Sequence, residues 1–312
     1  MALERPIVLA VVGDSAAGKT TLTDGIAEIL GPDRVTKVCT DDYHKYDRHE
    51  RRIRNLTPLH PDANYLDVLE LDLQRLCRGE PILKPVYDHR DGTLARPEYV
   101  SPKRFIIVEG LFGLYTERMR ECFDVKVYLD PAEELRRLWK ITRDTTKRGY
   151  TPNEVLRDLE RREPDSARFI RPQRAHADLV VRFHPGASGP AAGGDGHLNV
   201  RLVLRPRIPH PNLSAILGDA DDGPVRLTLG RDDGLPVDFL EIDGQVTPEE
   251  TARVEQAIWR SMPADVRPLP AAIGLYADRF ERRHSNPLAI TQALITFHLL
   301  RAAHAVTSRT VR

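Results

Sequence analysis

The segment VVGDSAAGKTTL, residues 11–22, constrains the fold of this chain more than any other. Gly13, Gly18, Lys19 and Thr20 fit the pattern G-x-x-x-x-G-K-[ST], with a short apolar run before it and a helical pattern after it. In that setting the backbone N–H groups of the loop wrap an oligophosphate, and the helix points its positive end at it. The segment therefore predicts a strand, a phosphate-binding loop and a helix.

The loop residues are expected to hold ATP and Mg²⁺. Lys19 reaches the β- and γ-phosphates in such loops, and the Thr20 hydroxyl binds Mg²⁺. We expect the nucleotide to contact Gly13, Asp14, Ser15, Ala16, Ala17, Gly18, Lys19, Thr20 and Thr21. The sequence has neither the N-K-x-D motif of GTPases nor the L-S-G-G-Q signature of transporter ATPases, which favours a kinase.

Short β-rich runs alternate with helical patterns over residues 1–185, which predicts an α/β P-loop kinase core with a mostly parallel sheet flanked by helices. The expected strands are 7–12, 34–39, 105–110, 125–129 and 178–183, and the expected helices are 19–30, 65–77, 132–147 and one capped by Thr151. Residues 186–196 predict a flexible loop. Residues 197–312 predict a β-rich α+β extension packed on the core, with strands in LNVRLVL, VRLTL and VDFLEI and helices near 248–259 and 287–305.

Charge and composition narrow the choice of partners. Lys+Arg and Asp+Glu both number 46, so no global field favours nucleic acid or an anionic membrane. The three cysteines are too few for a disulfide framework or a zinc site. No apolar run approaches the ~18 residues that span a bilayer, and no leader pattern precedes the first expected strand. We therefore expect a cytoplasmic protein that binds neither nucleic acid nor membrane.

Two adjacent carboxylates, Asp41 and Asp42, follow the second expected strand, where ligands bind in parallel α/β sheets. They suit a base for an attacking hydroxyl and a group that orients metal or substrate, although aspartates also favour turns. Arg48 and Arg51 belong to an arginine cluster just after them. Such a cluster is a solvated loop or a site for a substrate that already carries phosphate.

Further charged residues follow later strands. Glu109 ends the third expected strand, the place for an acidic Mg²⁺ partner. Lys140, Arg143 and Arg148 lie at spacings that put them on one side of a helix before Gly149. This pattern is typical of a solvated helix face, and also of a helical lid that neutralises a transferring phosphoryl group.

Six segments resemble, in chain order, the motifs of phosphoribulokinases, whose superfamily also holds uridine kinase and pantothenate kinase. They are GDSAAGKTT, CTDDYHKYDR, KPVYDH, IIVEGLFG, WKITRDTTKRGYT and ERREPDSARFIRPQRAHADLVV. The segments LNVRLVL, FLEIDGQVTPEETARVEQAIW and NPLAITQALITFHLL resemble the C-terminal part of the plant, cyanobacterial and archaeal class. The resemblance implies ATP-dependent phosphorylation of the 1-hydroxyl of ribulose 5-phosphate, for the Calvin cycle, by a homodimer.

The resemblance also implies roles for individual residues. Asp41 is the expected general base, Asp42 shares metal or substrate work, and Glu109 holds Mg²⁺. Lys19 and Arg143 are expected to act in catalysis. Substrate contacts are expected from His44, Arg48, Arg51, Tyr87, His89, Lys140, Arg143 and Arg148.

The sequence departs from the family pattern in the phosphate loop, in the motif IIVEGLFG and in lacking the C-terminal cysteine pair. Plant-type enzymes pair a phosphate-loop cysteine with one before the aspartates; Cys39 matches the second, but Ala17 stands at the first, so this regulatory disulfide is not expected. Phe112 stands where the family usually has a histidine. Three alternatives stay open: a uridine-kinase-like nucleoside kinase, a kinase of another pentose phosphate, and a nucleotide-dependent regulator without turnover.

Overall fold

The computed structural model describes residues 5–186, 197–213, 223–262, 273–278 and 281–310. A single sheet of eight strands forms its centre, in the order β2-β5-β1-β6-β7-β8-β10-β9. The strands are β1 (Ile7–Gly13), β2 (Val35–Cys39), β5 (Phe105–Gly110), β6 (Val125–Leu129), β7 (Leu179–Pro185), β8 (Leu198–Leu204), β9 (Val225–Asp232) and β10 (Leu235–Ile242). The first five in spatial order are parallel and the last three antiparallel, so the expected strands and the mostly parallel sheet are confirmed.

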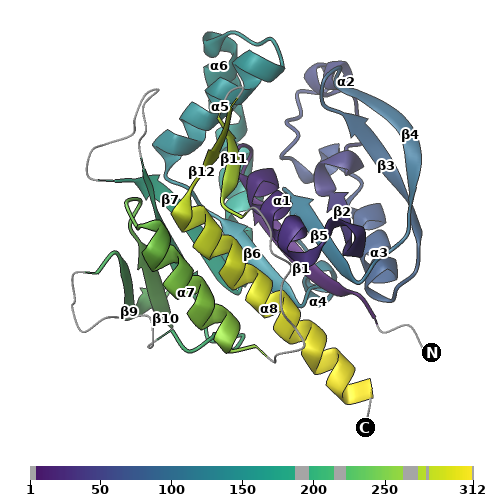
Figure 1. The fold of residues 1–312 in the computed structure, drawn as a ribbon. Coiled ribbons are helices and arrows are strands. Elements are labelled where there is room, and N and C mark those ends of the chain that lie inside the picture. Colours follow the sequence, from purple (N-terminus) through teal and green to yellow (C-terminus); the bar gives the residue numbers. More distant parts are fainter. Residues whose placement is uncertain (1–4, 187–196, 214–222, 263–272, 279–280, 311–312) are drawn as a thin grey trace.

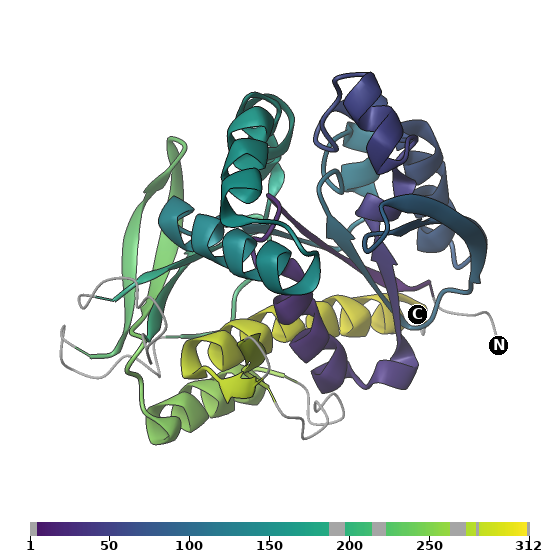
Figure 2. The ribbon, with the colours of Figure 1, turned by 90° about the horizontal axis from the view of Figure 1, so that it is seen from above.

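Helices cover both faces of the sheet (Figures 1 and 2). Ile7, Leu9 and Val11 of β1 point into a core shared with α1 (Lys19–Leu30), α7 (Pro248–Arg260) and α8 (Asn286–Thr310). The alternate residues of β1 point to the other face, covered by α3 (Leu66–Cys77) and α4 (Glu117–Glu121). Because β1 is buried on both faces, its sequence is an unbroken apolar run.

Two elements stand outside the central sheet near its carboxyl edge. The hairpin of β3 (Ile82–Asp88) and β4 (Thr93–Val100) and the short helix α2 (Arg48–Ile53) lie between β2 and β5 in the chain. The helices α5 (Glu133–Lys147) and α6 (Pro152–Asp165) form an antiparallel pair after β6, as expected of a helical lid (Figure 1). The Thr151 capping box begins α6 as predicted.

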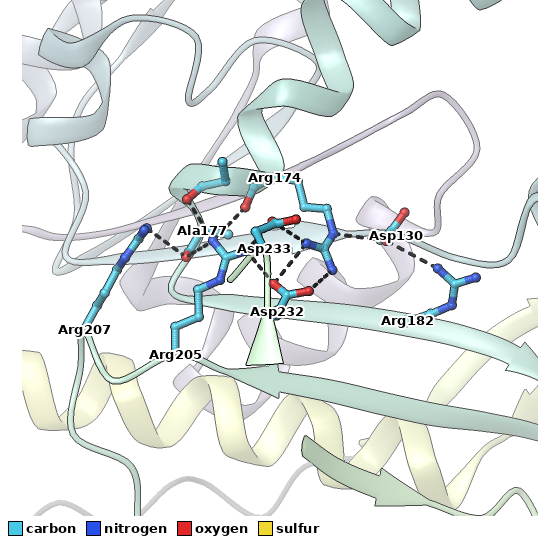
Figure 3. Close-up of polar contacts among 9 residues, drawn as sticks. Asp130, Arg174, Ala177, Arg182, Arg205, Arg207, Asp232 and Asp233 are labelled. Carbon is cyan, nitrogen blue, oxygen red and sulfur yellow. Dashed lines mark hydrogen bonds and ion pairs between the residues drawn. The ribbon is translucent and has the colours of Figure 1, made fainter. Parts of the chain in front are cut away.

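The C-terminal strands continue the sheet of the core, because β8 pairs antiparallel with β7 and with β10. A network of arginines and aspartates fastens the turn between β9 and β10 to the core (Figure 3). The buried Arg205 donates to the Ala177 carbonyl oxygen (3.2 Å) and to Asp232 (2.7 Å), and Arg174 joins Asp232 (2.7 Å) to Asp130 (3.2 Å). The turn therefore has a fixed place beside the carboxyl end of β6.

The last segments complete the layer under the sheet. Strands β11 (Leu275–Asp278) and β12 (Glu281–His284) form a small separate hairpin, and α8 lies beside α1 and α7. The helix predicted near 287–305 is confirmed, and its residues 288–300 are buried throughout. Of the predicted flexible loop, residues 187–196 lie outside the described residues. No helix in the described ranges has the length and apolarity needed to cross a membrane.

Candidate active site

The phosphate loop joins β1 to α1 and is ready to receive an anion. A side chain at Gly13 would place Cβ 2.6 Å from the Leu129 carbonyl oxygen, so only glycine lets the loop pass β6. Gly18 has a φ of 91°, in the left-handed region, at the start of α1. The Lys19 ammonium turns back over the loop and donates to the carbonyl oxygens of Gly13 and Asp14, both at 2.9 Å. It lies within the loop, where a bound phosphate would meet it.

Thr20 and Glu109 lie together at the edge of the sheet, as predicted for a metal site. The Thr20 hydroxyl donates to one carboxylate oxygen of Glu109 (3.2 Å), and the Thr23 hydroxyl donates to the other (3.0 Å). Burial raises the pKa of Glu109, while the charges of Lys37 and Lys19 oppose that shift. A buried carboxylate such as Glu109 is stabilised in its ionised form by a nearby cation. Its oxygens and the Thr20 hydroxyl are ligands of the kind that Mg²⁺ prefers.

No group of three or more His, Cys, Asp or Glu side chains within the described ranges could hold a metal ion. Mg²⁺ in kinases is commonly held by one or two protein oxygens and by the phosphates of the nucleotide. The pair of Thr20 and Glu109 fits that arrangement. Thr23 was not predicted, although it lies nearly one helical turn after Thr20 and on the same side of α1.

The two aspartates after β2 have different surroundings. The Oδ1 atom of Asp41 is buried and has no hydrogen-bond partner within the described residues. Asp42 accepts from the ammonium of the buried Lys84 (2.5 Å) and from the backbone N–H of Tyr87 (3.1 Å). Asp41 is therefore free to accept a proton, whereas Asp42 anchors β3. Both carboxylate oxygens of Asp42 are already hydrogen-bonded in this way, and its catalytic role stays a prediction.

Four side chains expected to bind substrate meet between α2 and the β3–β4 hairpin. The rings of His44 and Tyr87 pack edge to face with centroids 4.8 Å apart, and those of Tyr87 and His89 at 5.0 Å. The buried Arg51 donates to the Tyr87 hydroxyl (2.6 Å). Nδ1 of His44 lies 2.6 Å from Oδ1 of Asn64, an acceptor, so Nδ1 carries the proton and Nε2 is an acceptor.

The histidine and the arginines of this pocket differ in charge. Desolvation by burial lowers the pKa of His44 to about 4, although Asp41 opposes the shift, so the ring is neutral at pH 7. Arg48 donates to the His89 carbonyl oxygen (2.9 Å), and its guanidinium lies 5.7 Å from the ring centroid of Tyr150, beside the lid. The positive charges of the pocket are thus carried by guanidinium groups.

The lid touches the phosphate loop directly. Arg143 donates to the Ser15 hydroxyl and Arg136 to the Ser15 carbonyl oxygen, both at 3.3 Å. Ser166, in the π-helical turn Ser166–Ile170 after α6, donates to the carboxylate of Asp14. Arg143 therefore lies where predicted, beside the loop. Arg136 and Ser166 were not predicted, and only a contact between distant segments identifies them.

Asp144 organises the cations of α5. Its carboxylate meets Lys140 (2.8 Å), Arg143 (2.8 Å) and Arg148 (3.4 Å). Lys140 is 1% exposed and also pairs with Asp158 of α6 at 3.4 Å. Lys140 therefore ties the two lid helices together, which corrects its predicted substrate contact. Sequence reasoning missed Asp144 because it considered only the positive charges of this helix.

Phe112 and Cys39 are both accounted for by their surroundings. Phe112 is 1% exposed and packs edge to face on Tyr115 at 5.5 Å, so it is a core residue. Burial raises the pKa of the Cys39 thiol well above its usual value, and Asp41 and Asp42 add to the shift.

The chain is similar in sequence to known kinases of one family. The model of the Phosphoribulokinase / Uridine kinase family matches residues 8–188. The chain is 40% identical over 183 residues to a phosphoribulokinase of Synechocystis sp., covering 59% of this chain and 55% of that protein. It is 33% identical to the chloroplastic phosphoribulokinase of Triticum aestivum, covering 65% of this chain and 55% of that protein. A uridine kinase of Oceanobacillus iheyensis is 32% identical, with 65% of this chain and 94% of that protein covered.

The fold has a counterpart among solved structures. A phosphoribulokinase from Rhodobacter spheroides superimposes with a TM-score of 0.58 at 18% identity, covering 83% of this chain and 99% of that one. The chain spans about half the length of the curated phosphoribulokinases that it matches, 55% in the two named above.

Proposed function

The chain belongs to the Phosphoribulokinase / Uridine kinase family, and we propose that it transfers the γ-phosphoryl group of ATP to the 1-hydroxyl of D-ribulose 5-phosphate, giving ribulose 1,5-bisphosphate and ADP. The observation that carries the choice of acceptor is the pair of arginines beside the histidine–tyrosine pocket. Within the described residues, the Arg51 guanidinium makes two hydrogen bonds and that of Arg48 one, out of five N–H donors each. Donors remain for a phosphate group.

The proposed reaction places one proton transfer on the protein. Asp41 accepts the proton of the sugar hydroxyl as that oxygen attacks the γ-phosphorus, and its unpaired Oδ1 supports this role. Lys19 and Arg143, beside the loop, offset the charge that spreads over the phosphoryl oxygens. Mg²⁺, held by Thr20 and Glu109, supplies further charge neutralisation when bound.

The remaining site residues bind and orient the acceptor. Arg48 and Arg51 hold its phosphate, and the rings of His44, Tyr87 and His89 line the sugar. The neutral His44 presents Nε2 as an acceptor for a sugar hydroxyl. Asp42 supports this wall through Lys84 rather than by acting on the substrate.

The principal alternative is a nucleoside kinase, supported by the 32% identity to a uridine kinase. A nucleoside has no phosphate for Arg48 and Arg51 to bind, and its base would need amide or aromatic contacts. A kinase of another pentose phosphate would use the same arginines and the same base. These alternatives differ in the acceptor and not in the donor site.

The proposal extends to the oligomeric state and the cellular compartment. We propose a cytoplasmic homodimer formed by pairing of sheet edges. Strand β9 pairs within the chain only with β10, among the described strands, so one side of it is open. Leu229 in the middle of β9 is 82% exposed, as expected where a partner covers a strand.

A coupled assay of ADP release tests the reaction. Purified protein receives ATP and Mg²⁺ with ribulose 5-phosphate, with uridine, or with a second pentose 5-phosphate. Turnover with ribulose 5-phosphate alone is the expected result. Turnover with uridine alone would contradict the role of the arginines, and turnover only with the other pentose phosphate would change the acceptor while keeping the kinase. Nucleotide binding without turnover on any acceptor would support the regulator.

A further inference from the structure

Helix α1, which carries the phosphate-binding Lys19 and Thr20, has a glycine in its middle. Gly25 is buried and lies in the interior of Lys19–Leu30. A glycine there costs a helix about 1 kcal/mol relative to alanine, so its presence calls for a packing reason. The reason is Gln292 of α8: a side chain at Gly25 would place Cβ 2.1 Å from the Gln292 amide nitrogen and 2.3 Å from its Cδ.

The amide of Gln292 is fully buried and has partners at both ends. Its nitrogen donates to the carbonyl oxygen of Thr21 (3.2 Å) and lies 3.5 Å from that of Leu22. Its oxygen accepts the backbone N–H of Gly274 at 2.7 Å. A buried amide costs free energy unless it is hydrogen-bonded, so an apolar residue would suit this apolar helix better if Gln292 only filled space.

The two carbonyl oxygens that face the Gln292 nitrogen lie in the first turn of α1. Thr21 directly follows the two residues assigned to the phosphates and to Mg²⁺, so its carbonyl oxygen belongs to the same rigid turn. The position of that turn sets where the Lys19 and Thr20 side chains lie, and a shift of about 1 Å in a reacting geometry can cost as much as 10²-fold in rate. Figure 1 shows α8, in yellow, running beside the purple α1, with β11 next to both.

We propose that Gln292 is a positioning residue for nucleotide binding: from the C-terminal helix it fixes the first turn of the phosphate-loop helix. This inference rests on the nucleotide site of the proposed function but not on the acceptor. It assigns a role in ATP binding to a part of the chain beyond residues 8–188, the part that the family model matches. Gly274 extends the same link to the segment that leads into β11.

The test compares Gln292→Met with Thr291→Val in the full chain. Methionine keeps the length of the side chain and removes the amide. Thr291 is equally buried on the same helix, but among the described residues its hydroxyl bonds only to the Pro287 carbonyl oxygen of that helix (2.8 Å), so it is the matched control. The measurements are the Kd of MgADP by calorimetry, KM for ATP and for the acceptor, and the thermal midpoint.

For Gln292→Met we expect the Kd of MgADP and KM for ATP to rise about tenfold, with KM for the acceptor within about twofold of wild type. Thr291→Val should lower the thermal midpoint without changing either nucleotide constant. A Kd for Gln292→Met within about twofold of wild type would overturn the proposal.

The double variant Gly25→Ala/Gln292→Ala separates the effect of packing from the effect of hydrogen bonding. It also replaces Gln292→Met in the test if that variant does not fold. The alanine methyl group at position 25 fills space that the amide leaves. If the hydrogen bonds to Thr21 and Leu22 position the nucleotide site, the thermal midpoint of the double variant returns toward the wild-type value. Its Kd for MgADP then stays raised. Recovery of both would show a structural role only. Failure of the proposed acceptor leaves this test intact, because wild-type MgADP binding is measured without acceptor.

Discussion

Replacing each of the two neighbouring aspartates by asparagine should have opposite consequences. Asp41→Asn removes a carboxylate whose Oδ1 has no hydrogen-bond partner in the described structure. Asp42→Asn removes the charge that faces the ammonium of Lys84, which is 4% exposed. The first change concerns the reaction, and the second concerns the wall of the pocket.

The magnitudes follow from these surroundings. Loss of a general base lowers kcat by about 10²–10⁴-fold, and Asp41→Asn should change the free energy of unfolding by less than about 1 kcal/mol because no bond to its Oδ1 is lost. Removing one partner of a buried ion pair costs about 3–5 kcal/mol, and Asp42→Asn should show the lower end of this range in unfolding because the exposed Glu98 remains 3.9 Å from the Lys84 ammonium. Its kcat should fall less than that of Asp41→Asn, because Tyr87 moves while the base remains.

Three measurements on the same preparations distinguish the two roles. Coupled ADP release gives kcat and KM, urea unfolding gives stability, and calorimetry confirms that MgADP binding is unchanged in Asp41→Asn. Turnover close to wild type for Asp41→Asn would remove that residue from the role of base. A larger loss of kcat in Asp42→Asn, with stability unchanged, would reverse the two assignments.

Two further predictions concern the lid and the thiol. Burial disfavours the charged form of Asp144, but Arg143 and Lys140 outweigh this effect and hold its pKa at about 2, below its ordinary value of 3.8. The ion pairs should therefore contribute about 2–3 kcal/mol to stability above pH 4, and this contribution is lost as the pH falls toward 2. Urea unfolding of wild type and Asp144→Asn across this range should show the difference shrinking, and a constant difference would exclude it. Dithiothreitol should leave kcat unchanged, because Ala17 stands where the regulatory partner of Cys39 would be and the pKa of the half-buried Cys39 thiol is raised; activation by several-fold would contradict this.

The sequence predicted those parts of the fold that have a strong local pattern. The phosphate loop, the buried parallel strands and the capped helix after Thr151 each have a sequence pattern that lies within a dozen residues. The β3–β4 hairpin was missed because Pro85 interrupts β3, and the pairing shifts between Lys84 and Val86 there. The dipeptide Asp91-Gly92, which is typical of hairpin turns, indicates this hairpin in the sequence. Helix α2 likewise has a capping box of Asp47 and Glu50 that was not used.

The sequence predicted which residues lie at the candidate site, but not which contacts each of them makes there. Asp41 and Asp42 are indistinguishable in sequence, and only Lys84, distant in the chain, makes one an anchor. Lys140 and Arg143 lie on the same helix, but Lys140 is buried against α6, where it pairs with Asp158. The pairing of Gly25 with Gln292 joins the two ends of the chain and has no local pattern at all. Such contacts arise from packing, which sequence periodicity does not specify.

The order of the strands has a consequence for how such a kinase can diversify. Every side chain assigned to the acceptor comes from residues 40–104, one continuous detour that leaves the sheet at β2 and re-enters it at the adjacent β5. The groups assigned to ATP come from the β1–α1 turn, the end of β5 and the lid. The detour begins and ends on neighbouring strands, so a change in the length of its hairpin does not alter the order of the strands that carry the donor site. Substitutions in the hairpin and in α2 can therefore change which alcohol is phosphorylated, while α3 of the same detour must keep its packing on β1.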